Sequence, residues 1–592
     1  MKTAWDLSLL YSSLKDPRIE QDMKKAERAT AQFAKKWKGT KKYLSSPLVL
    51  KEAIDEYQEL INISSGAPYL YAMYRKILNT HDKEAEAVTA QLDERLSKLS
   101  VCIEFFGLSI GKIPKEKQST FLKHKALAPY AYFLSQIFEH SSHDLTEAEE
   151  RILTLTSDIR YGRWVQATDN ILNAHTVSWK GKKIPLAEAQ EKVSMLPMEE
   201  RRALHIKINE VYKAVAPVAE GEVNAVITNK KIGDELRGYK TSYEATVKGH
   251  GNTMKSIESL VKAVEETYPV VHKFYKHKAK LLKEKVLMYA DRSAPIGIVK
   301  HEYSFEQSVE IVRKAFFNLK PEYADIFDRL LNKGQVDVFP KTGKEGGAFC
   351  SSNTGTPTFV LLNHVGKVRS LMTLAHEMGH AIHAERSKTQ PAIYQGHSTA
   401  VAETASTFFE QVVFDALFET LSEEERLVAF HDHVQDSIAT IFRQVAAFKM
   451  EVELHDEIKK KGYIPKEQMA AIHNKHMSSY LGKSVMLQED DGYAFVSWSH
   501  IRRFFYVYTY AYGLLVSRAL YARVKKNPQA IEEVDAFLSA GGSMSPKDIF
   551  KKVGLNVESP TFWKMGLASM EADIEQFCSM GITKPKKAKS VR

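Results

Sequence analysis

The sequence predicts a large, mainly α-helical protein, and three observations support this fold class. The chain has 592 residues but only 29 glycines and 19 prolines, so turns and linkers can make up little of it. Long stretches place apolar residues at helical spacing among Lys, Glu and Ala. Apolar residues make up 44% and charged residues 26%, which is typical of globular proteins and excludes disorder for the body of the chain.

The first predicted region is a helical lobe, residues 1–190. From Asp16 to about Phe138 one amphipathic segment follows another. Thr146 is expected to begin a further helix, because its hydroxyl can cap free amide groups while the glutamates after it favour the positive end of the helix dipole. Residues 177–185, with Lys-Gly-Lys at their centre, indicate a short hairpin. We place the domain boundary just after this hairpin, at about residue 190.

The second predicted region, residues 191–580, is also helical but contains a small sheet. Three short strands are expected within 336–339, 347–350 and 358–362, because Gly, Pro, Ser and Asn separate these apolar stretches. A small sheet directly before a helix suggests a binding wall. After residue 362 the pattern predicts only helices and a loop at 541–546.

Residues 581–592 form a separate basic tail, and the remaining sequence suits a cytoplasmic protein. The formal charge is +10, and half of this excess lies in the tail, at Lys584, Lys586, Lys587, Lys589 and Arg592. The N-terminus lacks the apolar segment of a secretory signal, and no apolar run approaches the roughly 20 residues of a membrane-spanning helix. The three cysteines lie far apart, which suits a reducing compartment.

The segment that carries chemistry is His376-Glu377-Met378-Gly379-His380. Residues four apart share one face of a helix, so both imidazoles can bind one metal ion while Glu377 faces a water on that ion. Zinc would lower the pKa of this water to about 7, and Glu377 would take its proton as hydroxide attacks a peptide carbonyl. A chance match on a solvated helix is disfavoured, because the surrounding helix is apolar and would bury two histidines without partners.

A catalytic zinc ion needs a third protein ligand. The metzincin pattern is excluded, because His383 and Arg386 stand where its glycine and last histidine would be. Glu385 lies roughly 140° around the helix from His380 and points away. Glu403, 23 residues after His380, is the better candidate, because its small neighbours in residues 400–406 let two helices approach closely.

Two further residues offer support to these ligands, with simpler alternatives left open. Glu410 follows Glu403 by two helical turns and could accept a hydrogen bond from a ligand histidine, or be a solvated or helix-pairing glutamate. His383 could donate a hydrogen bond to a ligand or be a core histidine. Ligation by His383 is less favoured, because Glu403 completes the tetrahedral set.

Taken together, these segments resemble oligoendopeptidase F, a group within the thimet oligopeptidase (M3) family of zinc metallopeptidases. The matching stretches are residues 373–383, 402–407 and 505–513, and the resemblance extends from Trp5 to Ser543. It implies a mainly α, two-lobed ellipsoid with a deep central channel and a small β-sheet beside the HExxH zinc helix. It also implies one zinc ion per chain and substrates that are unstructured oligopeptides rather than folded proteins.

The resemblance assigns roles to residues beyond the zinc ligands. His500, Tyr506 and Tyr510 match family positions that bind the substrate and stabilise the oxyanion, and such donors typically lower a barrier by a few kcal/mol. From the residues alone, a buried aromatic helix would explain the tyrosines equally well. The chain departs from the usual family pattern at Ser499, where a proline usually precedes the histidine, and at Arg502-Arg503 after it. This departure leaves the local backbone open.

Gly346-Gly347-Ala348-Phe349-Cys350 resembles the glycine-rich strand of the family beside the zinc. An edge strand can pair with an extended peptide, and glycines allow a close approach of the two backbones. Gly347 and Ala348 are therefore expected to contact the substrate backbone. Cys350 is expected to be a small buried residue rather than a reactive thiol.

The predicted function is a cytoplasmic zinc metalloendopeptidase that cleaves internal bonds of short, unstructured oligopeptides. A zinc carboxypeptidase on a similar helical channel fold is the alternative, and cleavage of a terminally blocked peptide would distinguish the two. A nucleic-acid or anionic-surface binder is a third interpretation of the basic charge, but no RNA-binding or zinc-finger pattern supports it. The oligomeric state is left open.

Overall fold

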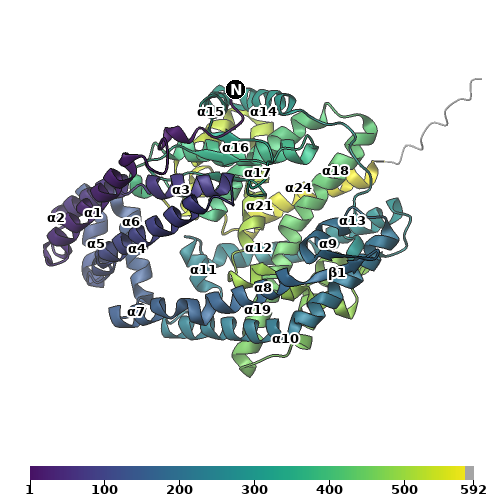
Figure 1. Ribbon diagram of the computed structural model, residues 1–592, viewed down its shortest axis with the longest axis horizontal. Coiled ribbons are helices and arrows are strands. Elements are labelled where there is room, and N and C mark those ends of the chain that lie inside the picture. The colour runs from purple at the N-terminus through teal and green to yellow at the C-terminus, as the bar shows by residue number, and fades with distance from the viewer. Residues whose placement is uncertain (581–592) are drawn as a thin grey trace, which may run out of the picture. The chain divides into compact units, whose positions relative to one another are not determined.

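The computed structural model describes residues 1–580, so the predicted basic tail at 581–592 lies outside the described residues. The chain divides into two compact units, and Figure 1 shows that both are predominantly helical. Unit 1 comprises residues 1–144, 301–417 and 520–555, and the described part of unit 2 comprises residues 145–300, 418–519 and 556–580. The predicted mainly α fold class is confirmed. The predicted boundary near residue 190 falls inside unit 2, and as a boundary between functional regions it stays a prediction.

The first stretch of unit 1 is built from helices with clear start signals. The first helix begins at Pro17, where the carboxylate of Asp16 accepts a hydrogen bond from the backbone amide of Arg18 and proline fits the first helical position. Aromatic and aliphatic side chains from this stretch form two buried clusters. The helices are α1 (Pro17–Trp37), α2 (Pro47–Ile63), α3 (Ala67–Leu78), α4 (Lys83–Gly111), α5 (Lys115–Lys123) and α6 (Ala131–His140).

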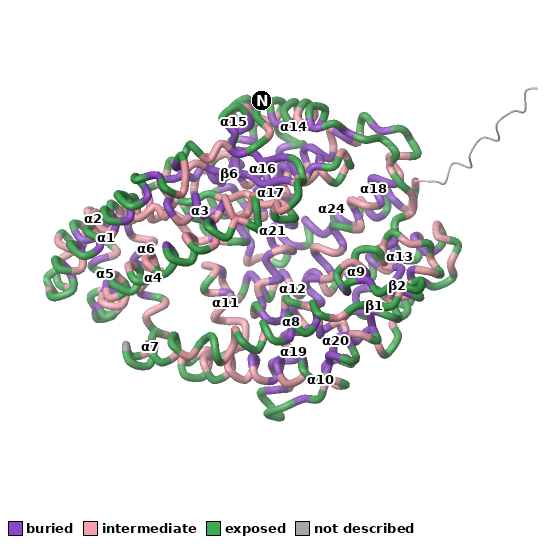
Figure 2. Tube along the Cα trace, viewed as in Figure 1, coloured by how far each residue is buried: buried purple, intermediate pink, exposed green. Residues whose placement is uncertain are grey.

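The remaining stretches of unit 1 carry the HExxH motif. Figure 2 shows that its helix, α16, is largely buried, as expected from the apolar residues around the motif. Helix α21 (Tyr508–Lys526) begins in unit 2 and ends in unit 1. The other helices are α14 (Phe305–Leu319), α15 (Pro321–Asn332), α16 (Val368–Ser387), α17 (Thr399–Phe418), α22 (Ile531–Ser539) and α23 (Pro546–Lys552).

The predicted three-stranded sheet is present in unit 1. Its strands are β4 (Val336–Asp337), β5 (Phe349–Ser351) and β6 (Phe359–Leu361), in the order β4-β6-β5. Strand β6 is buried, runs parallel to β4 and runs antiparallel to β5, with Cys350 opposite Val360. The indole nitrogen of Trp5 donates a hydrogen bond to the carbonyl of Val360 at 2.8 Å, so the N-terminal segment packs on this sheet. Because β6 is the central strand, β5 lies at an edge of this sheet.

Unit 2 is organised around the long helix α10. Together with α20 and the 3-10 segment Glu489–Val496, α10 encloses one large apolar cluster. The predicted helix start at Thr146 is confirmed, because Thr146 and Glu149 form a capping box. The helices are α7 (Glu147–Leu155), α8 (Arg163–Ala174), α9 (Leu186–Val193), α10 (Met198–Leu236), α11 (Glu244–Gly249), α12 (Met254–Glu266), α13 (Tyr268–Leu281), α18 (Glu423–Ile438), α19 (Gln444–Lys461), α20 (Lys466–Leu481) and α24 (Pro560–Ser579).

Two small sheets in unit 2 test the remaining strand predictions. The predicted hairpin is confirmed as β1 (Thr176–Trp179) paired antiparallel with β2 (Lys182–Pro185). The prediction that only helices follow residue 362 is wrong, because β7 (Val485–Met486) pairs in parallel with β3 (Leu287–Met288). A strand of two residues is too short to show the alternation from which strands are predicted.

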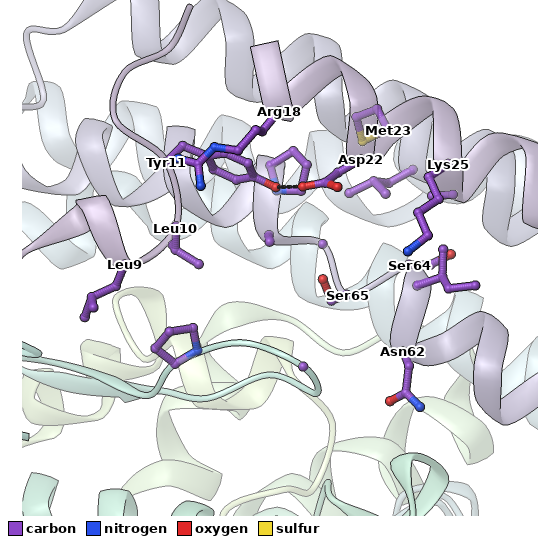
Figure 3. A pocket seen from close by; sticks show the side chains of 18 residues that line it. Leu9, Leu10, Tyr11, Arg18, Asp22, Met23, Lys25, Asn62, Ser64 and Ser65 are labelled. Atoms are coloured by element: carbon purple, nitrogen blue, oxygen red, sulfur yellow. Dashed lines mark hydrogen bonds between the residues drawn. The ribbon is translucent and has the colours of Figure 1, made fainter. Parts of the chain in front are cut away.

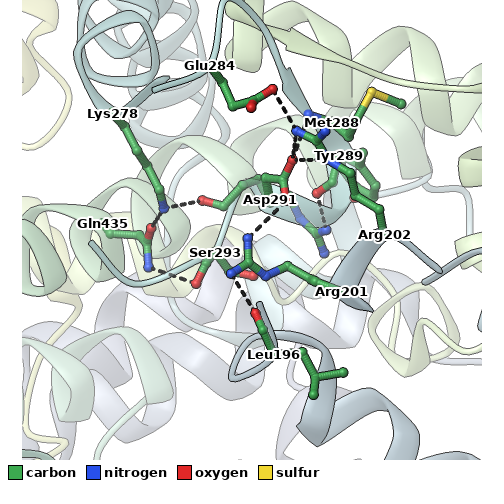
Figure 4. A network of polar contacts seen from close by, with 11 residues as sticks. Leu196, Arg201, Arg202, Lys278, Glu284, Met288, Tyr289, Asp291, Ser293 and Gln435 are labelled. Carbon is green, nitrogen blue, oxygen red and sulfur yellow. Dashed lines mark hydrogen bonds and ion pairs between the residues drawn. The ribbon is translucent and has the colours of Figure 1, made fainter. Parts of the chain in front are cut away.

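A buried network of charged side chains lies in unit 2, and Figure 4 shows it from close by. Asp291 is fully buried and accepts hydrogen bonds from Arg201 and Arg202 at 2.9 and 2.8 Å. The ammonium group of Lys278 is also fully buried and donates to Gln435 and to the backbone carbonyl of Arg292. This burial lowers the pKa of Lys278 to about 7.

Within residues 1–580, no helix combines the length and the apolar character that crossing a membrane requires.

Candidate metal centre and substrate-binding residues

Three predicted metal ligands converge in unit 1. Helix α16 places His376 and His380 on one face, and α17 presents Glu403 to them. One ligand atom from each of the three residues lies within 4.8 Å of the other two. The Nε2 atoms of His376 and His380 lie 3.8 and 4.0 Å from the carboxylate oxygens of Glu403. Two imidazoles and one carboxylate are a donor set that suits catalytic zinc.

The close approach of α16 and α17 depends on Gly379. A Cβ atom at this position would lie 2.8 Å from Cα of Ser406 and 3.2 Å from the side chain of Phe409. Any larger residue would therefore push α17 away from α16. Since Ser406 is only one turn from Glu403, the missing side chain at position 379 sets how near the carboxylate comes to the two histidines.

Glu410 determines which nitrogen of His376 is free. Its Oε2 atom lies 3.1 Å from Nδ1 of His376. An ionised carboxylate only accepts hydrogen bonds, so Nδ1 of His376 carries the proton of this contact, and Nε2 is left as the nitrogen that a metal ion would use. Nε2 is the atom that faces Glu403. The ring of His376 is thereby oriented for ligation.

The electrostatics of this group fit a bound cation. Burial raises the pKa of Glu403, and burial also raises the pKa of Glu377 to about 7. Burial lowers the pKa of His380 to about 3. Burial alone would lower the pKa of His376 as well, but its hydrogen bond to Glu410 and the nearby carboxylates raise it to about 9. Three carboxylates, those of Glu377, Glu403 and Glu410, thus act on His376, and a divalent ion would offset their negative charge.

The carboxylate of Glu385 forms hydrogen bonds away from the candidate metal ligands. It accepts hydrogen bonds from Thr358, Arg329 and Lys388, at 2.5, 2.8 and 2.5 Å. These contacts connect α16 to α15 and to the residue that precedes β6. Glu385 therefore joins helix and sheet and is not available as a metal ligand.

His383 lies in the core of unit 1. It is fully buried, and its ring stacks on that of His397 with ring centroids 3.8 Å apart. Within the described residues, neither nitrogen of His383 has a hydrogen-bond partner. The predicted hydrogen bond from His383 to a ligand is therefore not formed here, whereas its alternative as a core histidine fits the burial.

Gly347 and Ala348 lie directly before the edge strand β5. Gly347 is exposed and has a φ of 80°, a left-handed conformation that favours glycine. Its carbonyl accepts a hydrogen bond from the side chain of Asn363 at 2.8 Å. The segment is thus held in place while its outer side stays accessible.

His500, Tyr506 and Tyr510 form a second cluster, in unit 2. Nδ1 of His500 lies 2.5 Å from the hydroxyl of Tyr506, and the hydroxyls of Tyr506 and Tyr510 lie 3.5 Å apart. Burial, together with the charges of Arg443 and Arg503, lowers the pKa of His500. The intervening Tyr508 and Tyr512 are completely buried. The aromatic run therefore divides into core tyrosines and partly exposed tyrosines that accompany His500.

The described residues of unit 1 also contain a cavity of about 300 Å³ away from the predicted ligands (Figure 3). Tyr11, Arg18, Asp22, Lys25 and Ser64 contribute to its wall, and the hydroxyl of Tyr11 donates to Asp22 at 2.7 Å. None of the predicted site residues lines this cavity.

Comparison with known protein families decides the assignment. Residues 199–569 match the sequence model of peptidase family M3, and residues 110–174 match the model described as oligopeptidase F. The chain belongs to peptidase family M3. The predicted resemblance to oligoendopeptidase F and the prediction of a metalloendopeptidase are thereby confirmed.

Individual relatives of this M3 peptidase support the assignment, because they match it over most of its length. It is 25% identical to an oligoendopeptidase F homolog of Borreliella burgdorferi over 562 residues, which cover 93% of this chain and 94% of the relative. It is 25% identical to oligopeptidase PepF of Bacillus subtilis, with coverages of 89% and 80%. A crystal structure from Chlamydophila abortus, 21% identical, superposes with a TM-score of 0.85 over 98% of both chains, which shows a shared fold.

Proposed function

We propose that this M3 peptidase hydrolyses internal bonds of short, unstructured oligopeptides, using one zinc ion held by His376, His380 and Glu403. The observation that carries the proposal is the convergence of two imidazoles and a carboxylate on adjacent helices. Glu377 follows the first histidine and is itself buried. The names of its relatives, oligoendopeptidase F and oligopeptidase PepF, support oligopeptides as the substrate class.

Glu377 is the proposed general base. A zinc ion held by His376, His380 and Glu403 would supply a Lewis acid, which would make a water molecule more acidic and would polarise the scissile carbonyl. The carboxylate of Glu377 accepts the proton of the attacking water and then delivers it to the nitrogen of the leaving amine. Glu410 keeps the ring of His376 oriented through its hydrogen bond to Nδ1.

The substrate is proposed to be held by two further sets of groups. The backbone of Gly347 and Ala348 would pair with an extended peptide, since these residues lead into an edge strand. His500, Tyr506 and Tyr510 would bind the substrate and stabilise the negative charge that develops on the carbonyl oxygen. The mutual contacts of these three side chains support a joint action.

Removal and return of the metal tests the proposal. The purified protein is dialysed against a chelator and assayed on a fluorogenic peptide blocked at both ends, before and after one equivalent of zinc. We expect activity to disappear and to return with zinc. Activity that ignores the chelator would overturn the metal dependence. Cleavage only of peptides with a free C-terminus would favour the carboxypeptidase alternative.

Substitution of the base separates chemistry from metal binding. Glu377→Gln should keep the zinc content of the wild type, because Glu377 is not a ligand, and should lower kcat by a factor on the order of 10³. Metal analysis and steady-state kinetics measure the two quantities. Glu322→Gln, which changes an exposed acid of α15, is the control and should leave both unchanged. A Glu377→Gln variant with near-normal kcat would exclude this residue as the base.

A further inference from the structure

We propose that Glu451 and the buried ion pair Arg502–Glu222 are positioning residues, which hold His500 and Tyr506 in their paired arrangement. The inference rests on the proposed function of His500 and Tyr506. It adds residues that touch neither substrate nor metal but set the geometry of those that do.

The chain between His500 and Tyr506 makes an unfavourable turn. Phe504 and Phe505 have φ angles of 47° and 65°, and these two consecutive residues are bulky and left-handed. Side chains of this size avoid such conformations, so the surrounding structure must maintain them. The turn reverses the chain and brings the hydroxyl of Tyr506 to 2.5 Å from Nδ1 of His500.

Glu451 of α19 holds the second residue of this turn. Both of its carboxylate oxygens lie 3.0 Å from the backbone nitrogen of Phe505, and both residues are almost completely buried. A buried backbone N–H needs a hydrogen-bond partner, and this turn offers none from regular secondary structure. The carboxylate of Glu451 therefore stabilises the turn directly.

The ion pair holds the segment on the other side of the turn. Arg502 is 4% exposed and Glu222 of α10 is fully buried, and they form two parallel hydrogen bonds of 2.9 Å. The guanidinium group also donates to the carbonyls of Phe495, Val496 and Trp498. One side chain thus fastens the residues that precede His500.

The two carbonyls that flank the turn are held as well. The hydroxyl of Tyr161 donates to the carbonyl of Arg502, and the hydroxyl of Thr246 donates to the carbonyl of Phe504 at 2.9 Å. Arg502 is therefore held both at its side chain, by Glu222, and at its backbone carbonyl, by Tyr161.

Substitutions of Glu451 test the inference in the full-length, zinc-loaded enzyme. Glu451→Met removes the acceptor for the amide of Phe505, and we expect kcat to fall about 10- to 100-fold with little change in KM, as for a misplaced catalytic group. Glu451→Gln keeps an acceptor oxygen and should stay within about threefold of the wild type. Glu453→Gln, on the same helix but paired with Lys475 and His476, is the matched control.

A double-mutant cycle distinguishes positioning from a general loss of stability. If Glu451 acts through Tyr506, Glu451→Met should lower kcat by less than about threefold in a Tyr506→Phe background. An equally large loss in that background would overturn the proposal. If Glu451→Met does not fold, Arg502→Lys is compared with Arg503→Lys, since Arg503 is exposed, and only Arg502→Lys should lower kcat.

Hydrogen exchange gives a readout that needs no activity. Backbone amides of residues 499–507 should exchange faster in Glu451→Met than in the wild type or Glu451→Gln, at equal zinc content. Unchanged exchange, or faster exchange with normal kcat, would overturn the proposal. A wild-type enzyme without zinc-dependent activity would instead refute the proposed function, while the exchange data would still decide whether Glu451 holds the turn.

Discussion

At the scale of single residues, each of the two candidate clusters contains a side chain that can orient its neighbour. Glu410 directs the proton of His376 to Nδ1, and the hydroxyl of Tyr506 lies against Nδ1 of His500. Such partners were only partly accessible from the sequence. The spacing of Glu403 and Glu410 suggested that both share a helix face, but a hydrogen bond to one particular histidine requires two helices to be placed relative to each other.

Glu410 offers a direct test of this orienting contact. Glu410→Leu should weaken zinc binding by about 10- to 100-fold, because the ring of His376 loses the acceptor that fixes its tautomer. Glu410→Gln keeps an oxygen atom and should show a smaller loss. Competition with a chelating dye measures both affinities. Equal zinc affinity in the wild type and Glu410→Leu would show that the contact of 3.1 Å does not orient the ligand.

At the scale of secondary structure, the metal centre depends on how closely α16 and α17 pack. The HExxH spacing and the small residues around Glu403 predicted both helices and their contact. Gly379 lies within the HExxH segment, and the short distance to Ser406 explains why this position excludes a side chain. The parallel pair β3–β7 escaped prediction, since its two strands are separated by almost 200 residues and have two residues each.

Gly379→Ala should disturb the centre by forcing the two helices apart. The added methyl group would lie 2.8 Å from Cα of Ser406, so we expect a loss of stability of about 1–3 kcal/mol and weaker zinc binding. Gly233→Ala on α10 is the control, because a Cβ atom at position 233 would have no neighbour within 4 Å. There the same change should stabilise the helix by up to about 1 kcal/mol. Chemical denaturation and zinc titration give both quantities.

At the scale of the whole molecule, each compact unit combines stretches that lie far apart in the chain. Unit 1 combines the stretch 301–417, which carries the HExxH helix, with residues 1–144 and 520–555, and unit 2 also combines three separate stretches. The sequence cannot reveal this division. A boundary such as the one near residue 190 cuts the chain into consecutive segments, whereas each compact unit combines segments that are not consecutive. The buried charge network of unit 2 illustrates the same point, since Lys278 and Gln435 meet across 157 residues.

Lys278 makes the stability of the molecule depend on pH. Burial lowers its pKa in the folded state from 10.5 to about 7, so between these values the unfolded chain binds a proton that the folded chain does not. The contribution of Lys278 to the free energy of unfolding should therefore rise with pH across this window, by at most about 1.4 kcal/mol per pH unit. As the pH falls towards 7, this contribution is lost.

Lys278→Met should remove this slope. Urea denaturation at pH 7, 8 and 9 measures the free energy of unfolding of the wild type and the variant. The exposed neighbour Lys276 provides the control, since Lys276→Met should leave the slope of the wild type intact. Parallel curves for Lys278→Met and the wild type would show that Lys278 stays protonated in the folded protein.

The sequence by itself determined the helical class, the metal ligands to test and the family. These follow from local patterns: apolar spacing along helices, two histidines four residues apart, and a glutamate among small neighbours. Only the tertiary structure decided which tyrosines are core residues and that Glu222 and Arg502 meet across 280 residues. It also decided that Glu385 is hydrogen-bonded away from the candidate ligands and that His383 lies in the core. The reason is physical: local spacing fixes which face a side chain occupies, whereas burial and pairing depend on segments that meet only after folding.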